Sequence, residues 1–395
     1  PGTGKTTIIK CILQILKDKG LNVILCAPTG RASKRLSEAT GEDAKTIHRM
    51  LDLNYKEDGK GYFTYNENTR LDADIIIVDE VSMCDEYVFN SLIKSIKRGG
   101  RLIMVGDKDQ LPSVGAGNVL ADIINSQCVQ INYLTQIYRQ GEDSQIITNA
   151  HLINEGKMPI LNNKSKDFFF DNQNSQDVML QNIVDMVMTR LPKFAGVTSR
   201  DIQVLCPMKK GIVGVENVNI TLQNALNPLS EKHHQITVGN TNFRVGDRVI
   251  HTVNNYQMEW TNEADNSAGT GVFNGDIGEI AEVDTRELSL SVLFEDGRKA
   301  KYKQADFDQI ALAYAISIHK SQGSEFEIAL IAVAGGNYMI MTRNLIYTAV
   351  TRAKKMVVIV GNSDSLQKMI ANNYTAKRYS MLADFIKEKQ NIVKG

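Results

Sequence analysis

The chain has 395 residues, and its 43% hydrophobic and 23% charged side chains are typical of a soluble globular protein of about two domains. Lys plus Arg and Asp plus Glu balance at 45 each, which excludes a globally basic protein. Any nucleic-acid binding must therefore come from a local groove. The sequence contains no apolar run of about 18 residues that could cross a membrane. Five scattered cysteines, never in C-x-x-C spacing, favour reduced thiols in a cytoplasmic protein.

The chain opens with a glycine-rich run ahead of an apolar-periodic helix, and this run is the end of the phosphate-binding pattern G-x-x-x-x-G-K-[ST]. The pattern predicts that Lys5 contacts the β- and γ-phosphates of ATP and that Thr6 binds Mg²⁺. The residues assigned to nucleotide binding are Gly2, Thr3, Gly4, Lys5, Thr6 and Thr7. The first glycine of the pattern would precede Pro1. We therefore expect the natural start to lie upstream and this chain alone to hold nucleotide poorly.

The run 23–27 predicts a buried parallel strand, which ends in Pro28-Thr29-Gly30-Arg31 and a helix to about residue 39. Loops at the carboxyl ends of parallel strands bind ligands in open α/β sheets. Thr29 and Arg31 are therefore candidates to bind a phosphate, either of a nucleotide or of a nucleic-acid backbone. The alternative, in which Thr29 caps the helix, is compatible with such a contact.

The run 75–78 predicts a second buried strand, and Asp79 and Glu80 follow it directly. In a protein with a phosphate-binding loop, a strand-terminal acid holds Mg²⁺ and a neighbouring Glu orients the attacking water, so we assign these roles to Asp79 and Glu80. After the next strand, at 101–107, the amide of Gln110 is placed to sense the γ-phosphate. Arg139 follows as a candidate arginine finger.

Two further segments leave alternatives open. The aromatic flanks around Asp58-Gly59-Lys60-Gly61 predict a β-hairpin, which either wedges between the strands of a duplex or is an ordinary solvated excursion.

Short strands separated by turns predict a small β-barrel between the strands of a second parallel sheet. In the polar stretch 254–267 of this barrel, Trp260 either stacks on a base or, as we favour, packs on the barrel. The tail 363–389 has the pattern of an amphipathic helix.

The order and spelling of the motifs resemble the RecD-like branch of superfamily 1 DNA helicases. The motifs are PGTGKTT, APTGRA, TIHRM, VDEVSM, GDKDQLPSVGAGNVL, LTQIYRQ, AISIHKSQGSEF and NLIYTAVTRAKK. The resemblance implies an α/β fold of two RecA-like motor domains with parallel sheets, with ATP and Mg²⁺ in the cleft between them and a small SH3-like β-barrel inserted in the second. It implies ATP-driven movement 5′ to 3′ on single-stranded DNA, coupled to duplex unwinding in repair or recombination.

The same resemblance assigns roles to residues of the later motifs. Nucleotide contacts fall on Gln322, Gly323 and Glu325. Arg352 becomes the second arginine finger, for which the alternative is a surface ion pair. The DNA-binding candidates are Thr29, Arg31, His48, His319, Ser321 and Trp260.

The predicted boundaries are a first ATPase domain at 1–150 with a hairpin insert at about 52–71, a second motor domain at 151–238 and 306–395, and the barrel at 239–305. We expect a monomeric cytoplasmic motor that binds single-stranded DNA and duplex junctions, either free-standing or with other subunits of a helicase–nuclease complex. The alternatives are a superfamily 1 RNA helicase and a non-catalytic, motor-like subunit of an exonuclease complex. A nuclease is disfavoured because no second acidic cluster is visible.

Overall fold

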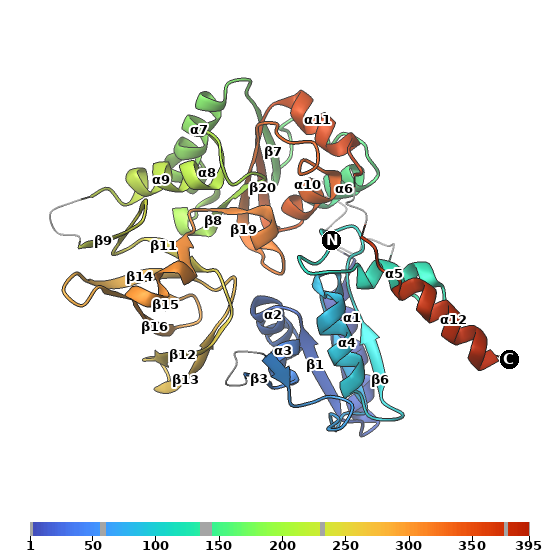
Figure 1. The fold of residues 1–395 in the computed structure, drawn as a ribbon. Coiled ribbons are helices and arrows are strands. Elements are labelled where there is room, and N and C mark those ends of the chain that lie inside the picture. Colours follow the sequence, from blue (N-terminus) through green and yellow to red (C-terminus); the bar gives the residue numbers. More distant parts are fainter. Residues whose placement is uncertain (1–2, 56–60, 135–143, 230–233, 375–377, 395) are drawn as a thin grey trace. The chain divides into compact units, whose positions relative to one another are not determined.

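A computed structural model describes residues 3–55, 61–134, 144–229, 234–374 and 378–394 (Figure 1). By its internal contacts the chain forms two units. The first unit holds residues 1–154, 322–324 and 374–395, and the second holds 155–321 and 325–373. The segment 374–395 groups with the first unit, although the predicted boundaries placed it in the second motor domain. The boundaries themselves remain a prediction.

The first unit is built on a four-stranded sheet in the order β2-β1-β5-β6, in which every neighbouring pair is parallel. The carboxyl ends of its strands therefore lie at one edge, where open α/β sheets bind ligands. The strands are β1 (Val23–Ala27), β2 (Ala44–Thr46), β5 (Ile75–Val78) and β6 (Arg101–Met104). The helices are α1 (Lys5–Asp18), α2 (Gly30–Thr40), α3 (Ile47–Met50), α4 (Glu86–Ser95), α5 (Val119–Ser126), α6 (Gln145–Asn154) and α12 (Leu382–Lys394), with the 3-10 turn η1 (Val81–Met83).

The apolar residues of β5 alternate between two hydrophobic clusters because successive side chains of a strand point to opposite faces. Ile77 belongs to the cluster that contains Ile9 and Leu13 of α1. Val78 belongs to a separate cluster, with Val88 of α4. Helices thus cover both faces of the sheet, which explains why β5 is a continuous apolar run rather than an alternating one.

The predicted hairpin is formed by β3 (Leu53–Tyr55) and β4 (Gly61–Phe63), which pair antiparallel with Leu53 opposite Phe63. Its turn lies outside the described residues. The ring of Phe63 is buried and lies 5.8 Å from the ring of His48, so the base of the hairpin packs on α3.

The second unit contains a parallel sheet and an antiparallel one. The five-stranded parallel sheet has the order β18-β8-β19-β20-β7, and the seven-stranded antiparallel sheet has the order β13-β12-β16-β15-β14-β11-β17. The parallel strands are β7 (Phe168–Asn172), β8 (Ile202–Cys206), β18 (Ala315–Ser317), β19 (Phe326–Val333) and β20 (Ala353–Gly361). The antiparallel strands are β11 (Arg248–His251), β12 (Asn255–Asn262), β13 (Ser267–Val272), β14 (Ile277–Asp284), β15 (Ser289–Phe294), β16 (Arg298–Lys303) and β17 (Ile310–Leu312).

The remaining elements of this unit pack around the two sheets or connect them. The helices are α7 (Gln176–Asp185), α8 (Leu191–Ala195), α9 (Val215–Leu226), α10 (Arg343–Val350) and α11 (Ser363–Ala371). A small antiparallel pair is formed by β9 (Gln235–Val238) and β10 (Thr241–Arg244). The π-helical segment η2 (Met186–Arg190) follows α7, and the 3-10 turns are η3 (Ser199–Asp201), η4 (Gln304–Gln309) and η5 (Ile318–Ser321).

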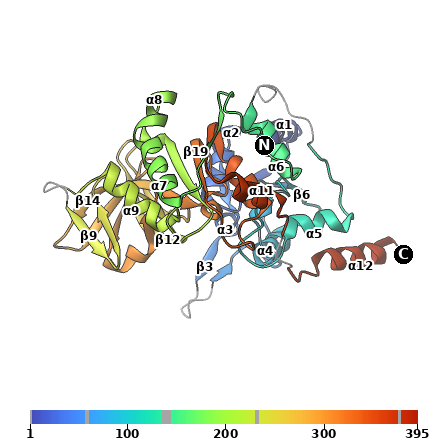
Figure 2. The ribbon, with the colours of Figure 1, turned by 90° about the horizontal axis from the view of Figure 1, so that it is seen from above.

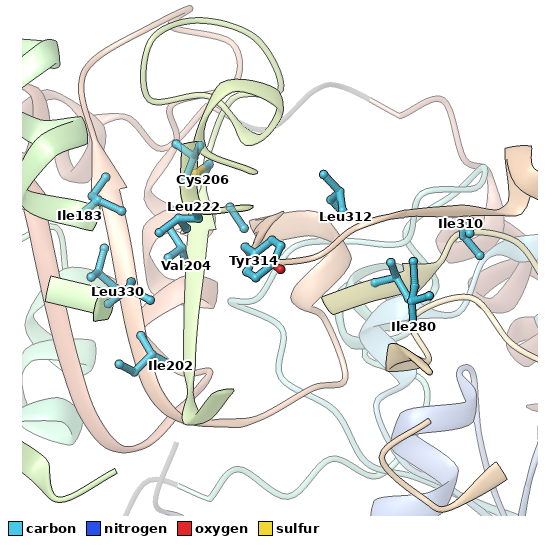
Figure 3. Packing of buried hydrophobic residues seen from close by; sticks show 14 of the residues in the cluster. Ile183, Ile202, Val204, Cys206, Leu222, Ile280, Ile310, Leu312, Tyr314 and Leu330 are labelled. Atoms are coloured by element: carbon cyan, nitrogen blue, oxygen red, sulfur yellow. The ribbon is translucent and has the colours of Figure 1, made fainter. Parts of the chain in front are cut away.

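One hydrophobic core runs through both sheets of the second unit (Figure 3). Val204 and Leu330 come from the parallel sheet, whereas Ile280 and Leu312 come from the antiparallel one. Tyr314, in the connection between β17 and β18, belongs to the same cluster. Because buried side chains are closely packed, the antiparallel sheet is held against the parallel sheet rather than tethered by a flexible linker.

A buried carboxylate reinforces this connection. Asp247 is completely buried and accepts hydrogen bonds from Asn227 Nδ2 (2.8 Å), the Arg244 backbone N–H (2.7 Å) and Tyr314 Oη (3.0 Å), and also from Gln223 Nε2. These donors come from α9, from β10 and from the β17–β18 connection. Asp247 thus connects three separate segments, and its hydrogen bonds offset the cost of burying a polar group.

Trp260 lies in strand β12, not in a loop. Its indole ring is 5.8 Å from the Arg298 guanidinium carbon. A Cβ added at Gly269 on the neighbouring strand would lie only 2.7 Å from the ring, so glycine at that position gives the indole its space. The structure therefore supports packing on the barrel, which the sequence already favoured.

The last helix, α12, packs along α5 of the first unit, as Figures 1 and 2 both show. The Gln390 side chain donates to the backbone oxygen of Cys128 (3.3 Å), just beyond α5. This packing explains why the C-terminal segment groups with the first unit. None of the described helices has both the length and the apolar character that a bilayer span requires.

Candidate nucleotide site

The phosphate-loop residues lead directly into α1. Gly4 precedes the helix in a left-handed conformation (φ 79°), which glycine adopts without strain, and no side chain caps the helix. Its first turn also carries no acidic residue. Backbone N–H groups at such a helix start suit an anionic ligand. Thr3, Thr6 and Thr7 surround this turn, whereas Gly2 lies outside the described residues.

Asp79 and Glu80 leave the sheet together at the end of β5. The Glu80 backbone N–H donates to Asp79 Oδ1 (2.8 Å), and Glu80 adopts φ 54°, a strained conformation for a side chain of its size. Burial and, secondarily, the charge of Glu80 raise the pKa of Asp79 from its ordinary value to about 6. Two acids held this close in a buried site favour a cation beside them.

Lys5 and Gln110 converge on a third acid, Asp107, which follows β6. The Lys5 ammonium lies 3.7 Å from Asp107 Oδ2, and Gln110 Nε2 donates to the same oxygen at 3.3 Å. The Asp109 backbone N–H donates to the other oxygen, Oδ1, at 3.1 Å. Asp107 is not among the site residues that the sequence predicts. The available signal was its position, since it follows β6 much as Asp79 follows β5.

Two buried oxygens of this site have no hydrogen-bond partner among the described residues: Glu80 Oε2 and Gln110 Oε1. Glu80 is 7% exposed and Gln110 is 5% exposed, so solvent does not readily satisfy them. Buried acceptors require donors. Waters, including those bound to Mg²⁺, supply such donors, and the Lys5 ammonium and the helix start supply charge for phosphates. The residues present therefore fit MgATP.

The segment 322–324 returns to the first unit and contacts two of its loops. Gln322 Nε2 donates to the backbone oxygen of Leu111 (2.8 Å), the residue after Gln110. Arg31 Nη1 donates to Ser324 Oγ (2.8 Å). Gly323 has φ 72°, and a Cβ there would lie 2.9 Å from Thr29 Oγ1, so this close approach requires glycine. Gln322 is thus connected to the loop that carries Gln110. Glu325 belongs to the second unit.

The other DNA-binding candidates of the first unit lie on helix starts and short helices. Thr29 caps α2 by accepting from the Ala32 backbone N–H (3.3 Å), which agrees with the capping interpretation. His48 lies on α3, and burial lowers its pKa while Asp85 opposes the shift. DNA contact by Thr29, Arg31 and His48 remains a prediction.

The candidates of the second unit lie on η5 and after α10. Burial lowers the pKa of His319, and the fully buried Ser321 hydroxyl donates to the Ile318 backbone oxygen (2.7 Å). Arg352 is 3% exposed and donates to Thr348 O and Thr351 Oγ1, both at 3.2 Å, among its contacts. The roles assigned to these three residues remain predictions. The other proposed arginine finger, Arg139, lies outside the described residues.

Three family models match successive parts of the chain. An AAA domain matches residues 1–169. The SH3 domain of ATP-dependent RecD-like DNA helicases matches residues 218–294, which include β11 to β15 of the antiparallel sheet. The UvrD-like helicase C-terminal domain matches residues 312–360, which include β18, β19 and α10.

Two curated relatives match along most of the chain. The ATP-dependent RecD2 DNA helicase of Deinococcus radiodurans is 33% identical over 382 residues, which cover 97% of this chain and 49% of that protein. The RecBCD enzyme subunit RecD of Mycolicibacterium smegmatis is 29% identical over 395 residues, which cover 91% of this chain and 67% of that protein. The chain thus spans about half the length of the first relative.

Solved structures of Pif1 helicases share the fold. Bacteroides Pif1 in complex with ADP-AlF3 and ssDNA aligns with a TM-score of 0.53 and 20% identity, covering 100% of this chain and 92% of that one. Candida albicans Pif1 aligns with a TM-score of 0.51 and 17% identity, covering 98% and 94%. The predicted fold of two RecA-like domains with an inserted SH3-like domain is confirmed. The match to the SH3 domain of RecD-like DNA helicases and the two RecD relatives add a likeness in sequence to this likeness in fold: the chain is similar to the RecD-like helicases along most of its length.

Proposed function

We propose that this chain is the motor part of an ATP-dependent DNA helicase that moves 5′ to 3′ on single-stranded DNA and unwinds duplexes in repair or recombination. The observation that carries the proposal is the convergence of Lys5 and Gln110 on Asp107, at the sheet edge where Asp79 and Glu80 also emerge. A phosphate-binding lysine, a metal-binding acid, a base and a γ-phosphate sensor are the parts that ATP hydrolysis needs. The name of the Deinococcus relative, a DNA helicase, supports DNA as the track.

In this proposal ATP is the substrate and each residue of the site has one task. Lys5 neutralises the β- and γ-phosphates. Thr6 and Asp79 hold Mg²⁺, which supplies charge stabilisation at the phosphates. Glu80 orients the attacking water through Oε2, which has no partner in the part of the chain that the structure describes. Gln110 donates to the γ-phosphate once its bond to Asp107 breaks.

The remaining nucleotide contacts are proposed for residues of the later motifs. Arg139 and Arg352 act as arginine fingers that stabilise charge in the transition state. Gln322, Gly323 and Glu325 contribute to the same ATP site, and the bond from Gln322 to Leu111 supports this for the first of them.

DNA is gripped mainly through its phosphates, which makes binding tolerant of sequence and sensitive to salt. The proposed contacts are Thr29, Arg31, His48, His319 and Ser321, with Trp260 on the barrel. Arg31 is included because a guanidinium presents its N–H donors in a planar fork that suits phosphate oxygens. We propose a monomeric cytoplasmic motor. The relative named as a RecBCD subunit is the reason to examine association with a nuclease.

The test is steady-state ATPase activity of a chain that carries the complete phosphate-loop pattern, with and without single-stranded DNA. We expect DNA to stimulate turnover by roughly tenfold or more. This stimulation should fall as the salt concentration rises, because phosphate contacts release counterions and salt therefore weakens DNA binding. RNA of the same sequence should compete poorly. Equal turnover with and without DNA would contradict a translocase, and preferential stimulation by RNA would favour the RNA-helicase alternative.

A further inference from the structure

The loop that follows Gln110 is clasped by an arginine from the end of the chain. Arg378 Nη1 donates to Gly115 O (2.7 Å), Gly117 O and Ser113 Oγ (3.1 Å), while Nη2 donates to Ser113 O (2.6 Å). One guanidinium therefore binds both oxygens of Ser113 and two backbone carbonyls further along the loop. Neither the sequence motifs nor the matched family models include Arg378.

The other side of this loop lies close against the start of α4. The Glu86 backbone N–H donates to Ala116 O (3.0 Å). A Cβ at Gly115 would lie 2.3 Å from Asp85 Oδ2, and a Cβ at Gly117 would lie 2.3 Å from Glu86 Cγ. The loop therefore has little room to move toward α4, and the bonds from Arg378 hold three of its residues as well.

The segment that carries Arg378 is itself anchored on the first unit. Ser380 Oγ donates to Glu86 Oε1, and α12 then packs along α5. The chain reaches this position directly from the second unit, which it leaves at Asn373. The side chain that clasps the loop is thus only a few residues from one of the four points at which the chain passes between the two units.

We propose that Arg378 is a positioning residue for ATP hydrolysis, which holds the loop 111–117 so that Gln110 keeps its place in the site. This inference rests on the proposed function. The short separation between Gln110 and Ser113 carries the argument, because a loop pinned at Ser113, Gly115 and Gly117 restricts the backbone of Gln110 three residues earlier. Loss of a positioning contact lowers turnover without removing any group that touches ATP.

The experiment compares Arg378→Ala with Arg98→Ala, an exposed arginine of the same unit, in a chain with the complete phosphate loop. We expect Arg378→Ala to lower the DNA-stimulated kcat roughly tenfold and to leave the KM for ATP within about twofold, while Arg98→Ala changes neither. Arg378→Lys should recover part of the loss, because an ammonium keeps the charge but lacks the planar fork. In a Gln110→Ala background, Arg378→Ala should have little further effect.

Hydrogen exchange of the 111–117 amides provides a readout that needs no ATPase activity. Faster exchange in Arg378→Ala than in Arg98→Ala supports the clasp, and unchanged exchange overturns it. An unchanged kcat, or a kcat loss that adds fully to that of Gln110→Ala, overturns the positioning role. A wild-type chain without DNA-stimulated turnover would instead contradict the proposed function, and the exchange comparison would still decide whether Arg378 holds the loop.

Discussion

Replacement of Lys5 by alanine is expected to abolish ATP turnover, with a loss of roughly a thousandfold in kcat/KM. The reason is electrostatic, because the Lys5 ammonium places a positive charge at the start of α1, where the phosphates bind. In the structure this ammonium pairs with Asp107, and phosphate oxygens can take the place of that carboxylate. The variant should fold normally, because the Lys5 side chain is partly exposed and its 3.7 Å ion pair contributes little to stability.

The matched control is Lys10→Ala, since Lys10 is an exposed lysine on the same helix. Its DNA-stimulated ATPase activity should equal that of the wild type. If Lys5→Ala kept more than about a tenth of the wild-type rate, the phosphate-binding role of the loop would be wrong.

Glu80→Gln is the second large effect, and we expect kcat to fall by roughly 100- to 1,000-fold while nucleotide binding persists. The amide retains the size of the carboxylate and removes its charge and its ability to orient and deprotonate water. Glu80 Oε2 is buried without a partner among the described residues, so a water is the natural donor to it. Binding of a fluorescent ATP analogue should stay within about threefold of wild type, because Glu80 acts on the attacking water rather than on the phosphates.

Glu38→Gln on α2 serves as the control. Glu38 is exposed, and this substitution makes the same chemical change away from the site. A parallel loss of nucleotide affinity and turnover in Glu80→Gln would indicate that Glu80 holds the nucleotide or the metal, and would remove it from the role of base.

The sequence predicts most of the first unit's site because each part is local. A glycine-rich run before a helix, and acids directly after an apolar strand, identify Lys5, Asp79 and Glu80 without tertiary information. Asp107 was missed because its role depends on Lys5 and Gln110 meeting at one oxygen. This convergence is a product of the strand order, which local patterns do not encode.

The strand that contains Trp260 was missed for a different reason. Strand β12 carries mostly polar side chains, and among its residues only Met258 is buried. The apolar alternation that reveals a half-buried strand is therefore too weak to detect. Strand β12 forms because its backbone pairs with β13 on one side and β16 on the other, and the side-chain pattern does not reveal this pairing.

The C-terminal tail shows the limit of amphipathic patterns. The periodicity of 363–389 predicts helix, and the structure has α11 and α12 there. The two helices belong to different units, since α11 lies in the second and α12 packs on α5 of the first. A helical apolar stripe requires a partner but does not say which one, so the pattern alone does not predict that α12 packs on α5.

The most direct test of the whole account is unwinding of a partly single-stranded duplex by a chain with the complete phosphate loop, in the presence of Mg²⁺ and ATP. A duplex with a single-stranded 5′ tail and one with a 3′ tail of the same sequence are compared, and strand separation is followed by loss of energy transfer between two fluorophores. The account predicts ATP-dependent separation of the 5′-tailed duplex, none of the 3′-tailed duplex, and none of either with Lys5→Ala. Separation of the 3′-tailed duplex in preference, or separation that does not need ATP, would contradict it.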